Sequence, residues 1–145
     1  MGWILASLLA LFPLTTNLEV DGEKAQQQGV AIVLYVSRSD CTFCRRLEKD
    51  VLAPLVKAGA LNAVMFRQLS LDGAAEVRGF DGKVLAPMSL AVHYNAEITP
   101  TILFLDAQGR ELLPRISGYT KNDYYSFYLE RAVGKAQRLV VKQAL

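Results

Sequence analysis

Runs of apolar residues mark four strands along this chain. Val30–Val36 (Val-Ala-Ile-Val-Leu-Tyr-Val) is a continuous apolar run that is rich in β-branched residues. Such a run is typical of a central strand that is buried on both faces. The other predicted strands are Ala63–Leu71, Thr101–Leu105 and Glu111–Ser117. Pro114 within the last run favours an edge strand or a bulge, because proline has no N–H to donate to a sheet.

Helical segments lie between and after these strands. One helix carries an apolar stripe at intervals of four residues, formed by Phe43, Leu47, Val51 and Leu55. Pro54 lies inside this helix and should kink it or restart it near Ala53. Three more helices are predicted: a polar one ended by Gly29 at Leu18–Gly29, one at Ala86–Tyr94, and a closing one at Lys121–Val141 capped by Thr120.

The order of the elements predicts the fold class. A strand, helix and strand in succession form a parallel pair, and the turn Asp106–Gly109 joins the last two strands as an antiparallel hairpin. Asp72–Lys83, which contains three glycines, is predicted to be a loop. We therefore expect an α/β domain with a central mixed four-stranded sheet flanked by helices.

The first 18 residues differ from the rest of the chain. No charged side chain occurs between Met1 and Leu18, and Trp3–Leu14 is nearly continuous apolar sequence. This run is short for a membrane span but matches the apolar core of a secretory signal. We interpret residues 1–18 as a signal peptide or an N-terminal membrane anchor, followed by a domain over residues 19–145. Because no Lys or Arg precedes the run, an apolar helix that packs on the domain stays a third interpretation.

Composition narrows the class of protein further. The chain has 145 residues, 52% of them hydrophobic, and a formal net charge of +2 from 16 basic and 14 acidic residues. This length fits one domain with a core of its own. No basic stripe and no charged tail is visible, so the composition gives no support to nucleic acid as a partner.

Two cysteines, the only ones in the chain, directly follow the first predicted strand. Cys41 and Cys44 enclose Thr42 and Phe43. On a helix, residues three apart share one face, with Cα atoms roughly 5 Å apart, which is within the range of a disulfide. A ring this short removes little entropy from the unfolded chain, so the pair is better suited to redox exchange than to stabilisation.

Taken in order along the chain, these features resemble the thioredoxin fold over about residues 19–137. They are the buried strand, the two cysteines at a helix start, Thr99-Pro100 before a strand, and the strand-turn-strand-helix ending. The segment Ser39–Glu48, together with the long glycine-containing insertion after the second strand, resembles exported bacterial thioredoxin-like proteins of the SoxW-like type. The resemblance implies a thioredoxin fold with an extra N-terminal helix.

The resemblance also implies a function, a location and a substrate surface. We expect a monomeric, periplasmic thiol–disulfide oxidoreductase that needs no organic cofactor or metal. Its partners would be protein or small-molecule thiols and disulfides, and an upstream redox protein that donates or accepts electrons. The implied Thr99–Pro100 bond is cis and faces the cysteines, so that the Thr99 backbone can pair with an extended substrate. Thr42 and Phe43 complete the predicted substrate-binding residues.

Two departures from thioredoxins stand out. The motif Trp-Cys-Gly-Pro-Cys is absent, since Ser39-Asp40 precedes the pair and Thr42-Phe43 separates it. Tyr35 stands six residues before Cys41, where thioredoxins carry a buried aspartate. A tyrosine does not accept a proton at neutral pH. If thioredoxins use that carboxylate for proton transfer, this protein must use water or another group.

The position of each cysteine suggests its role. A thiolate attacks a disulfide, and a helix N-terminus lowers a thiol pKa through free N–H groups and the helix dipole. We therefore expect Cys41 to attack and the more buried Cys44 to resolve the mixed disulfide. Arg38, Arg45 and Arg46 would add positive potential near Cys41, and Asp40 would oppose it.

Other interpretations of the pair are weaker but open. A zinc site needs four ligands, and the chain offers no second cysteine pair and only one histidine, His93. Two thiolates could bind Cu(I), although no methionine cluster accompanies them. A third alternative is a non-catalytic redox sensor or binding protein. The tyrosines near the closing helix, Tyr119, Tyr124, Tyr125 and Tyr128, are predicted to pack it, with a substrate platform as the alternative.

Overall fold

The computed structural model describes residues 11–120 and 124–144. Four strands form its main sheet in the order β2-β1-β5-β6. They are β1 (Ile32–Ser37), β2 (Met65–Ser70), β5 (Thr101–Leu105) and β6 (Ile116–Ser117). β1 runs parallel to β2 and antiparallel to β5, and β6 runs antiparallel to β5. The mixed four-stranded sheet predicted from the sequence is confirmed.

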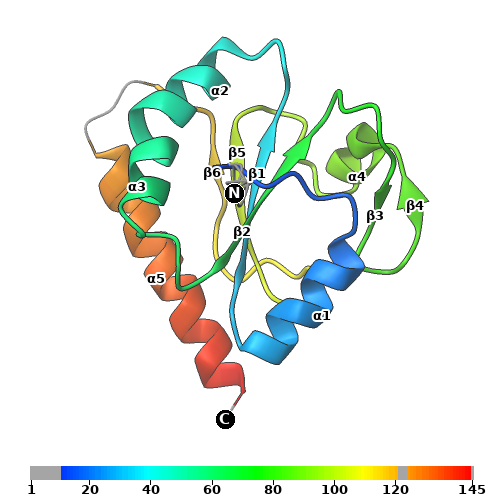
Figure 1. Ribbon diagram of the computed structural model, residues 1–145, viewed down its shortest axis with the longest axis vertical. Coiled ribbons are helices and arrows are strands. Elements are labelled where there is room, and N and C mark those ends of the chain that lie inside the picture. The colour runs from blue at the N-terminus through cyan, green and yellow to red at the C-terminus, as the bar shows by residue number, and fades with distance from the viewer. Residues whose placement is uncertain (1–10, 121–123, 145) are drawn as a thin grey trace, which may run out of the picture.

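Helices cover both faces of this sheet (Figure 1). The helical elements are α1 (Leu18–Gln28), α2 (Thr42–Leu47), the π-helical turn η1 (Glu48–Leu52), α3 (Ala53–Lys57), α4 (Pro87–His93) and α5 (Tyr125–Gln143). α2, α3 and α5 lie on one face of the sheet, and α1 and α4 lie on the other. α2, η1 and α3 follow one another without a break, and Pro54, which has no N–H to donate, stands at the second residue of α3, just after the π-helical turn.

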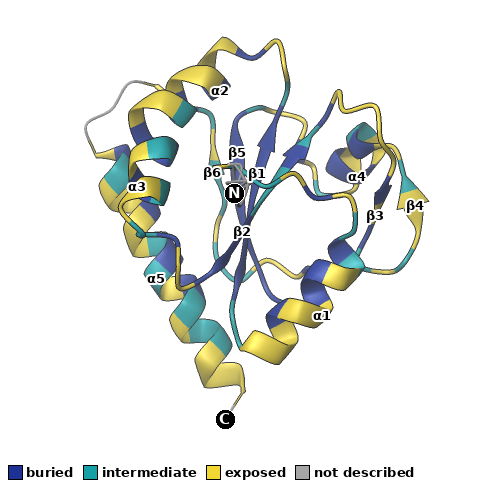
Figure 2. Cartoon of the chain, viewed as in Figure 1, coloured by how far each residue is buried: buried dark blue, intermediate teal, exposed yellow. Residues whose placement is uncertain are grey.

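The core has two layers, one on each side of β1. Val33 and Tyr35 point into the cluster formed with α2, α3 and α5, whereas Ile32 and Leu34 point into the cluster formed with α1 and α4. This alternation is the period of two expected of a strand. All six residues of β1 are buried, as Figure 2 shows for the centre of the sheet. The continuous apolar run therefore forms the central strand.

Three boundaries differ from the prediction. The expected loop 72–83 contains β3 (Val77–Arg78), which forms a small antiparallel sheet with β4 (Val84–Leu85) just after it. The expected strand Glu111–Ser117 is ordered as a strand only at β6, because Pro114 cannot donate to a ladder. α5 begins at Tyr125, with Tyr124 and not Thr120 at its N-cap.

The described part of the predicted leader, residues 11–18, contacts the domain. The N–H of Thr15 donates to the carbonyl of Gln68 at 2.9 Å, and the N–H of Gln68 donates to the carbonyl of Pro13 at 2.8 Å. The ring of Phe12 lies edge-on to those of Tyr35 and Phe66, each at 6.2 Å between centroids. This segment covers the outer edge of β2. The rest of the predicted leader, residues 1–10, lies outside the described residues.

Membrane crossing was one of the sequence-based interpretations. Within residues 11–120 and 124–144, no helix is both long and apolar enough to span a bilayer.

Candidate active site

The site begins where β1 ends. A tight loop that contains Ser39 follows β1. The Ser39 N–H donates to the exposed carboxylate of Asp72 at 3.0 Å, and the Ser39 hydroxyl donates to the same carboxylate. The guanidinium of Arg45 donates to the Ser39 carbonyl. Because these hydrogen bonds tie the loop to the end of β2 and to α2, they fix the position of Cys41, which is the N-cap of α2.

Cys41 and Cys44 form a disulfide, with Cα atoms 5.2 Å apart. The Sγ of Cys41 accepts the N–H of Cys44 at 3.0 Å, so it occupies the capping position of the helix. Cys41 is 8% exposed and Cys44 is 1% exposed. Of the two sulfurs, that of Cys41 is therefore the more accessible to a substrate.

Tyr35 and Glu48 lie on the buried side of the pair. The Tyr35 hydroxyl donates to the Cys44 carbonyl at 3.5 Å, and its ring is fully buried. Burial raises the pKa of Tyr35, and the nearby Glu48 carboxylate raises it further. Burial likewise raises the pKa of Glu48, whereas Arg45 lowers it. Tyr35 thus stays neutral at physiological pH, and Glu48 is the titratable carboxyl beside it.

Thr99 and Pro100 lie at the same end of the sheet as the cysteine pair. Thr101 pairs with Val36, so the residues just before β5 lie next to the loop that leads from β1 to Cys41. The Thr99–Pro100 peptide bond is cis. The Pro100 carbonyl accepts the N–H of Gly118 at 2.7 Å, whereas the Thr99 backbone has no hydrogen-bond partner among the described residues.

Comparison with known families identifies this arrangement. Residues 18–132 match the model of the thioredoxin-like domain. The chain belongs to that family. A comparison with curated protein sequences found no match.

Solved structures give this thioredoxin-like protein the same fold. The oxidoreductase DsbH has a TM-score of 0.62 at 18% identity, over 92% of this chain and 95% of its own. A thioredoxin-fold protein from Helicobacter pylori has a TM-score of 0.57 at 21% identity, over 79% of this chain and 80% of its own. Thioredoxin NaTrxh from Nicotiana alata has a TM-score of 0.56 at 18% identity, over 85% of this chain and 94% of its own.

Family, fold and the disulfide at a helix start together support a thiol–disulfide oxidoreductase in general. The narrower resemblance to SoxW-like proteins stays a prediction. Across the parts of the chain that the structure describes, no three His, Cys, Asp or Glu side chains gather closely enough to hold a metal ion.

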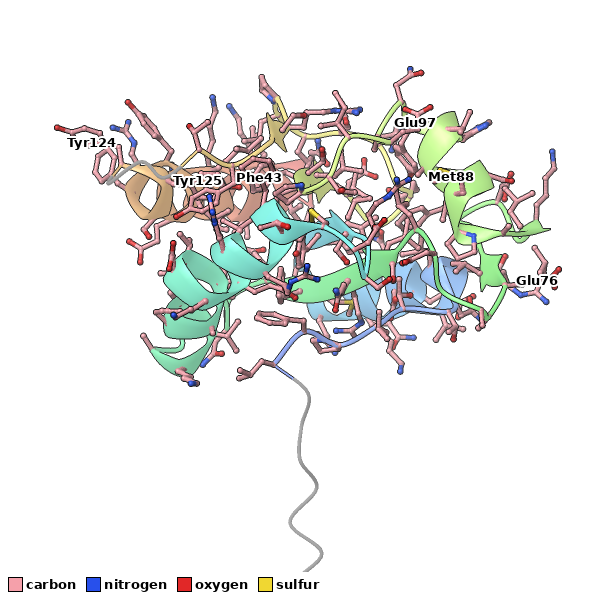
Figure 3. All side chains as sticks on the ribbon, turned by 90° about the horizontal axis from the view of Figure 1, so that it is seen from above. Phe43, Glu76, Met88, Glu97, Tyr124 and Tyr125 are labelled. Atoms are coloured by element: carbon pink, nitrogen blue, oxygen red, sulfur yellow. A yellow bond between two sulfur atoms is a disulfide. The ribbon has the colours of Figure 1, made fainter. Side chains whose placement is uncertain are left out.

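The residues between the cysteines face solvent. Phe43, labelled in Figure 3, is 52% exposed at the start of α2. The Arg46 guanidinium lies 5.8 Å from its ring centroid. Thr42 is also exposed. Ile98, just before Thr99, is 67% exposed. Phe43 and Ile98 are thus two large apolar side chains that are exposed to water.

The prediction that four tyrosines pack the closing helix is right for two of them and wrong for the other two. Tyr119 and Tyr125 are buried with their rings edge to face at 5.2 Å, and the Tyr119 hydroxyl donates to Asp50 at 3.1 Å. Tyr124 and Tyr128 are exposed, and Figure 3 shows Tyr124 projecting away from the body of the molecule. Helical period alone did not separate the two pairs, because the start of α5 was expected four residues too early.

Sequence reasoning did not single out Glu48. Its signal was present, since it stands four residues after Cys44 and such residues share a helix face.

Proposed function

We propose that this protein exchanges disulfides with the cysteines of exported proteins or with small thiols through Cys41 and Cys44. The observation that carries the proposal is the asymmetry of the pair. Cys41 caps the helix and is the more exposed residue, whereas Cys44 is nearly inaccessible. The N–H group that now donates to the Cys41 sulfur would stabilise a thiolate there, because charged acceptors form stronger hydrogen bonds.

In the reduced protein, the Cys41 thiolate attacks one sulfur of a substrate disulfide. A mixed disulfide forms, and the other substrate sulfur leaves as a thiolate that takes a proton from solvent. Cys44 then loses its proton and attacks the Cys41 sulfur, which releases the second substrate thiol. Two electrons pass from the cysteine pair to the substrate, and the pair ends as the disulfide seen here. The protein acts as a disulfide reductase in this direction.

The substrate segment binds between the cysteine loop and the Thr99–Pro100 turn. The unpaired backbone of Thr99 is suited to pair with an extended chain, as in β-strand addition. The exposed Phe43 and Ile98 would then contact apolar side chains of that segment, and Thr42 lies beside the attacking sulfur. Pro100, which is buried, shapes the turn.

The charge-free N-terminal sequence supports export to the periplasm, with or without retention of this segment as a tether. In that compartment a reductase needs a second redox protein that returns the pair to its reduced state. We propose that the protein works as a monomer with such a partner.

Trapping tests the roles of the two cysteines. Cys44→Ser cannot resolve a mixed disulfide, so it should accumulate covalent complexes with substrates through Cys41. Cys41→Ser should accumulate few, because its remaining thiol is buried. Both variants would be expressed in the same host and compared on non-reducing gels. Equal trapping by the two variants would contradict the assignment.

A further inference from the structure

The resolving step poses a problem of proton transfer. Cys44 is 1% exposed, and a buried thiol is protonated because burial disfavours its thiolate. It must lose a proton before it can attack the Cys41 sulfur. The Tyr35 hydroxyl donates to the Cys44 carbonyl, but burial raises its pKa. Because the hydroxyl is therefore already protonated, it cannot accept the Cys44 proton. Water or another side chain has to accept this proton.

Glu48 is the candidate acceptor of the Cys44 proton. It follows Cys44 by four residues in an unbroken helical run, and its N–H donates to the Cys44 carbonyl. The Tyr35 hydroxyl donates to the same carbonyl. Glu48 is half-buried, and its charge acts on Tyr35. It therefore lies one helical turn from the resolving cysteine, and close enough to Tyr35 for their charges to interact.

Glu48 also reaches solvent. It lines a cavity of about 330 Å³ together with Arg38, Arg45, Ser37, Ser39, Ser70, Gln68 and Leu14. All but the last of these side chains are polar, and the cavity is large enough for several water molecules. A proton on Glu48 can thus exchange with bulk water without crossing the core.

We propose that Glu48 accepts the Cys44 proton, relayed by water, when Cys44 resolves the mixed disulfide. The proposal rests on the disulfide-exchange function proposed above and names its proton acceptor. The Cys44 S–H bond breaks and its proton passes to the Glu48 carboxylate. The Cys44 thiolate then forms the bond to the Cys41 sulfur, and the bond from Cys41 to the substrate sulfur breaks. Glu48 returns the proton to solvent through the cavity.

The electrostatic surroundings fit this role. Arg45 on the same helical run and Arg38 on the loop after β1 line the cavity with Glu48, and β2 contributes only the uncharged Gln68 and Ser70. Tyr35 of β1 does not line the cavity, but it is close enough for the charge of Glu48 to act on it. Burial raises the pKa of Glu48, which makes it a better proton acceptor than an exposed glutamate, and Arg45 limits the rise. Because Glu48 acts through water, it is a positioning residue for the proton and does not touch the reacting sulfurs.

A two-step reaction with dithiobis-nitrobenzoate separates attack from resolution. Reduced protein should release one nitrothiobenzoate when Cys41 attacks and a second when Cys44 resolves. In Glu48→Gln, which keeps the side-chain size, we expect an unchanged first phase and a second phase slower by about tenfold or more. The wild-type second phase should lose rate on acidification as Glu48 becomes protonated, and Glu48→Gln should lack that inflection. Glu130→Gln, an exposed charge change on α5, should match wild type.

Each outcome decides a separate question. A wild-type protein that releases only one equivalent would contradict the proposed function itself. Two normal phases in Glu48→Gln, with the wild-type pH profile, would overturn only the role of Glu48. Arg45→Gln provides a second variant, should Glu48→Gln fail to fold. Loss of the arginine should move the inflection to higher pH, and an inflection that stays in place would also overturn the inference.

Discussion

The two cysteine sulfurs have different surroundings although their residues are only three positions apart. Cys41 ends the loop after β1 and caps a helix, whereas Cys44 lies one turn further in, above Tyr35 and against the core. The difference follows from helix geometry, because a side chain at the N-cap lies in front of the free N–H groups of the first turn, whereas a side chain one turn further along points away from them. The loop that places Cys41 is therefore part of the site.

Asp72 holds this loop, and its contribution depends on pH. Hydrogen bonds from the Ser39 hydroxyl and N–H lower the pKa of the Asp72 carboxyl. A lowered folded pKa means that the stabilisation is present above the unfolded pKa of about 3.9 and is lost as pH falls through the folded pKa. We predict that Asp72→Asn unfolds at a slightly lower temperature than wild type at neutral pH.

Thermal unfolding of both proteins across a pH series checks this prediction. The difference between them should shrink as the medium becomes more acidic than about pH 4, where wild type also loses the carboxylate. A difference that is constant over the whole series would show that Asp72 acts by something other than its charge.

Among the structural elements, the segment before α1 has an unexpected role. Its hydrogen bonds to Gln68 and the packing of Phe12 cover the edge strand β2, which would otherwise present unpaired backbone groups. Thr15 also donates to Asp21, and Asp21 pairs with Arg67 of β2 at 3.1 Å. The segment thus joins α1 to the sheet.

We predict that a chain starting at Leu18 is less stable than one starting at Leu11. Removal of residues 11–17 takes away part of the burial of Phe12, four backbone hydrogen bonds and the Asn17 cap of α1, which should cost about 3 to 6 kcal/mol. Denaturant unfolding of the two chains measures the difference. Equal midpoints would show that the contacts contribute nothing. If a signal peptidase processes the protein, we accordingly expect cleavage before Phe12, which N-terminal sequencing of the exported form would establish.

For the molecule as a whole, the sequence predicted the architecture well and the details of the site less well. Val30–Val36 is apolar enough to be buried on both faces, so its central place in the sheet followed from its apolar run. Thr101–Leu105 was predicted as a strand, and the structure adds that it is buried beside β1. The β3–β4 hairpin was missed because strands of two residues carry no periodic signal. The cysteine pair and Thr99-Pro100 were predicted as a site because a family resemblance joined them.

Glu48 could not be identified by family resemblance. Its position four residues after Cys44 was visible in the sequence, but the neighbours that raise its pKa come from the fold. The charge-coupled Tyr35 belongs to β1, and Gln68 of the cavity belongs to β2. Only the packing of α2 and η1 against these strands distinguishes Glu48 from the exposed charges beside it.

The central claim is that the Cys41–Cys44 pair of this thioredoxin-like protein catalyses disulfide exchange. Reduction of insulin disulfides by dithiothreitol, followed by turbidity, tests it most directly. We predict that the wild-type protein accelerates the reaction well above the rate with dithiothreitol alone, and that Cys41→Ser abolishes the acceleration. A wild-type rate equal to that of dithiothreitol alone, in protein shown to be folded and reduced, would contradict the claim and favour a redox sensor that binds without turnover.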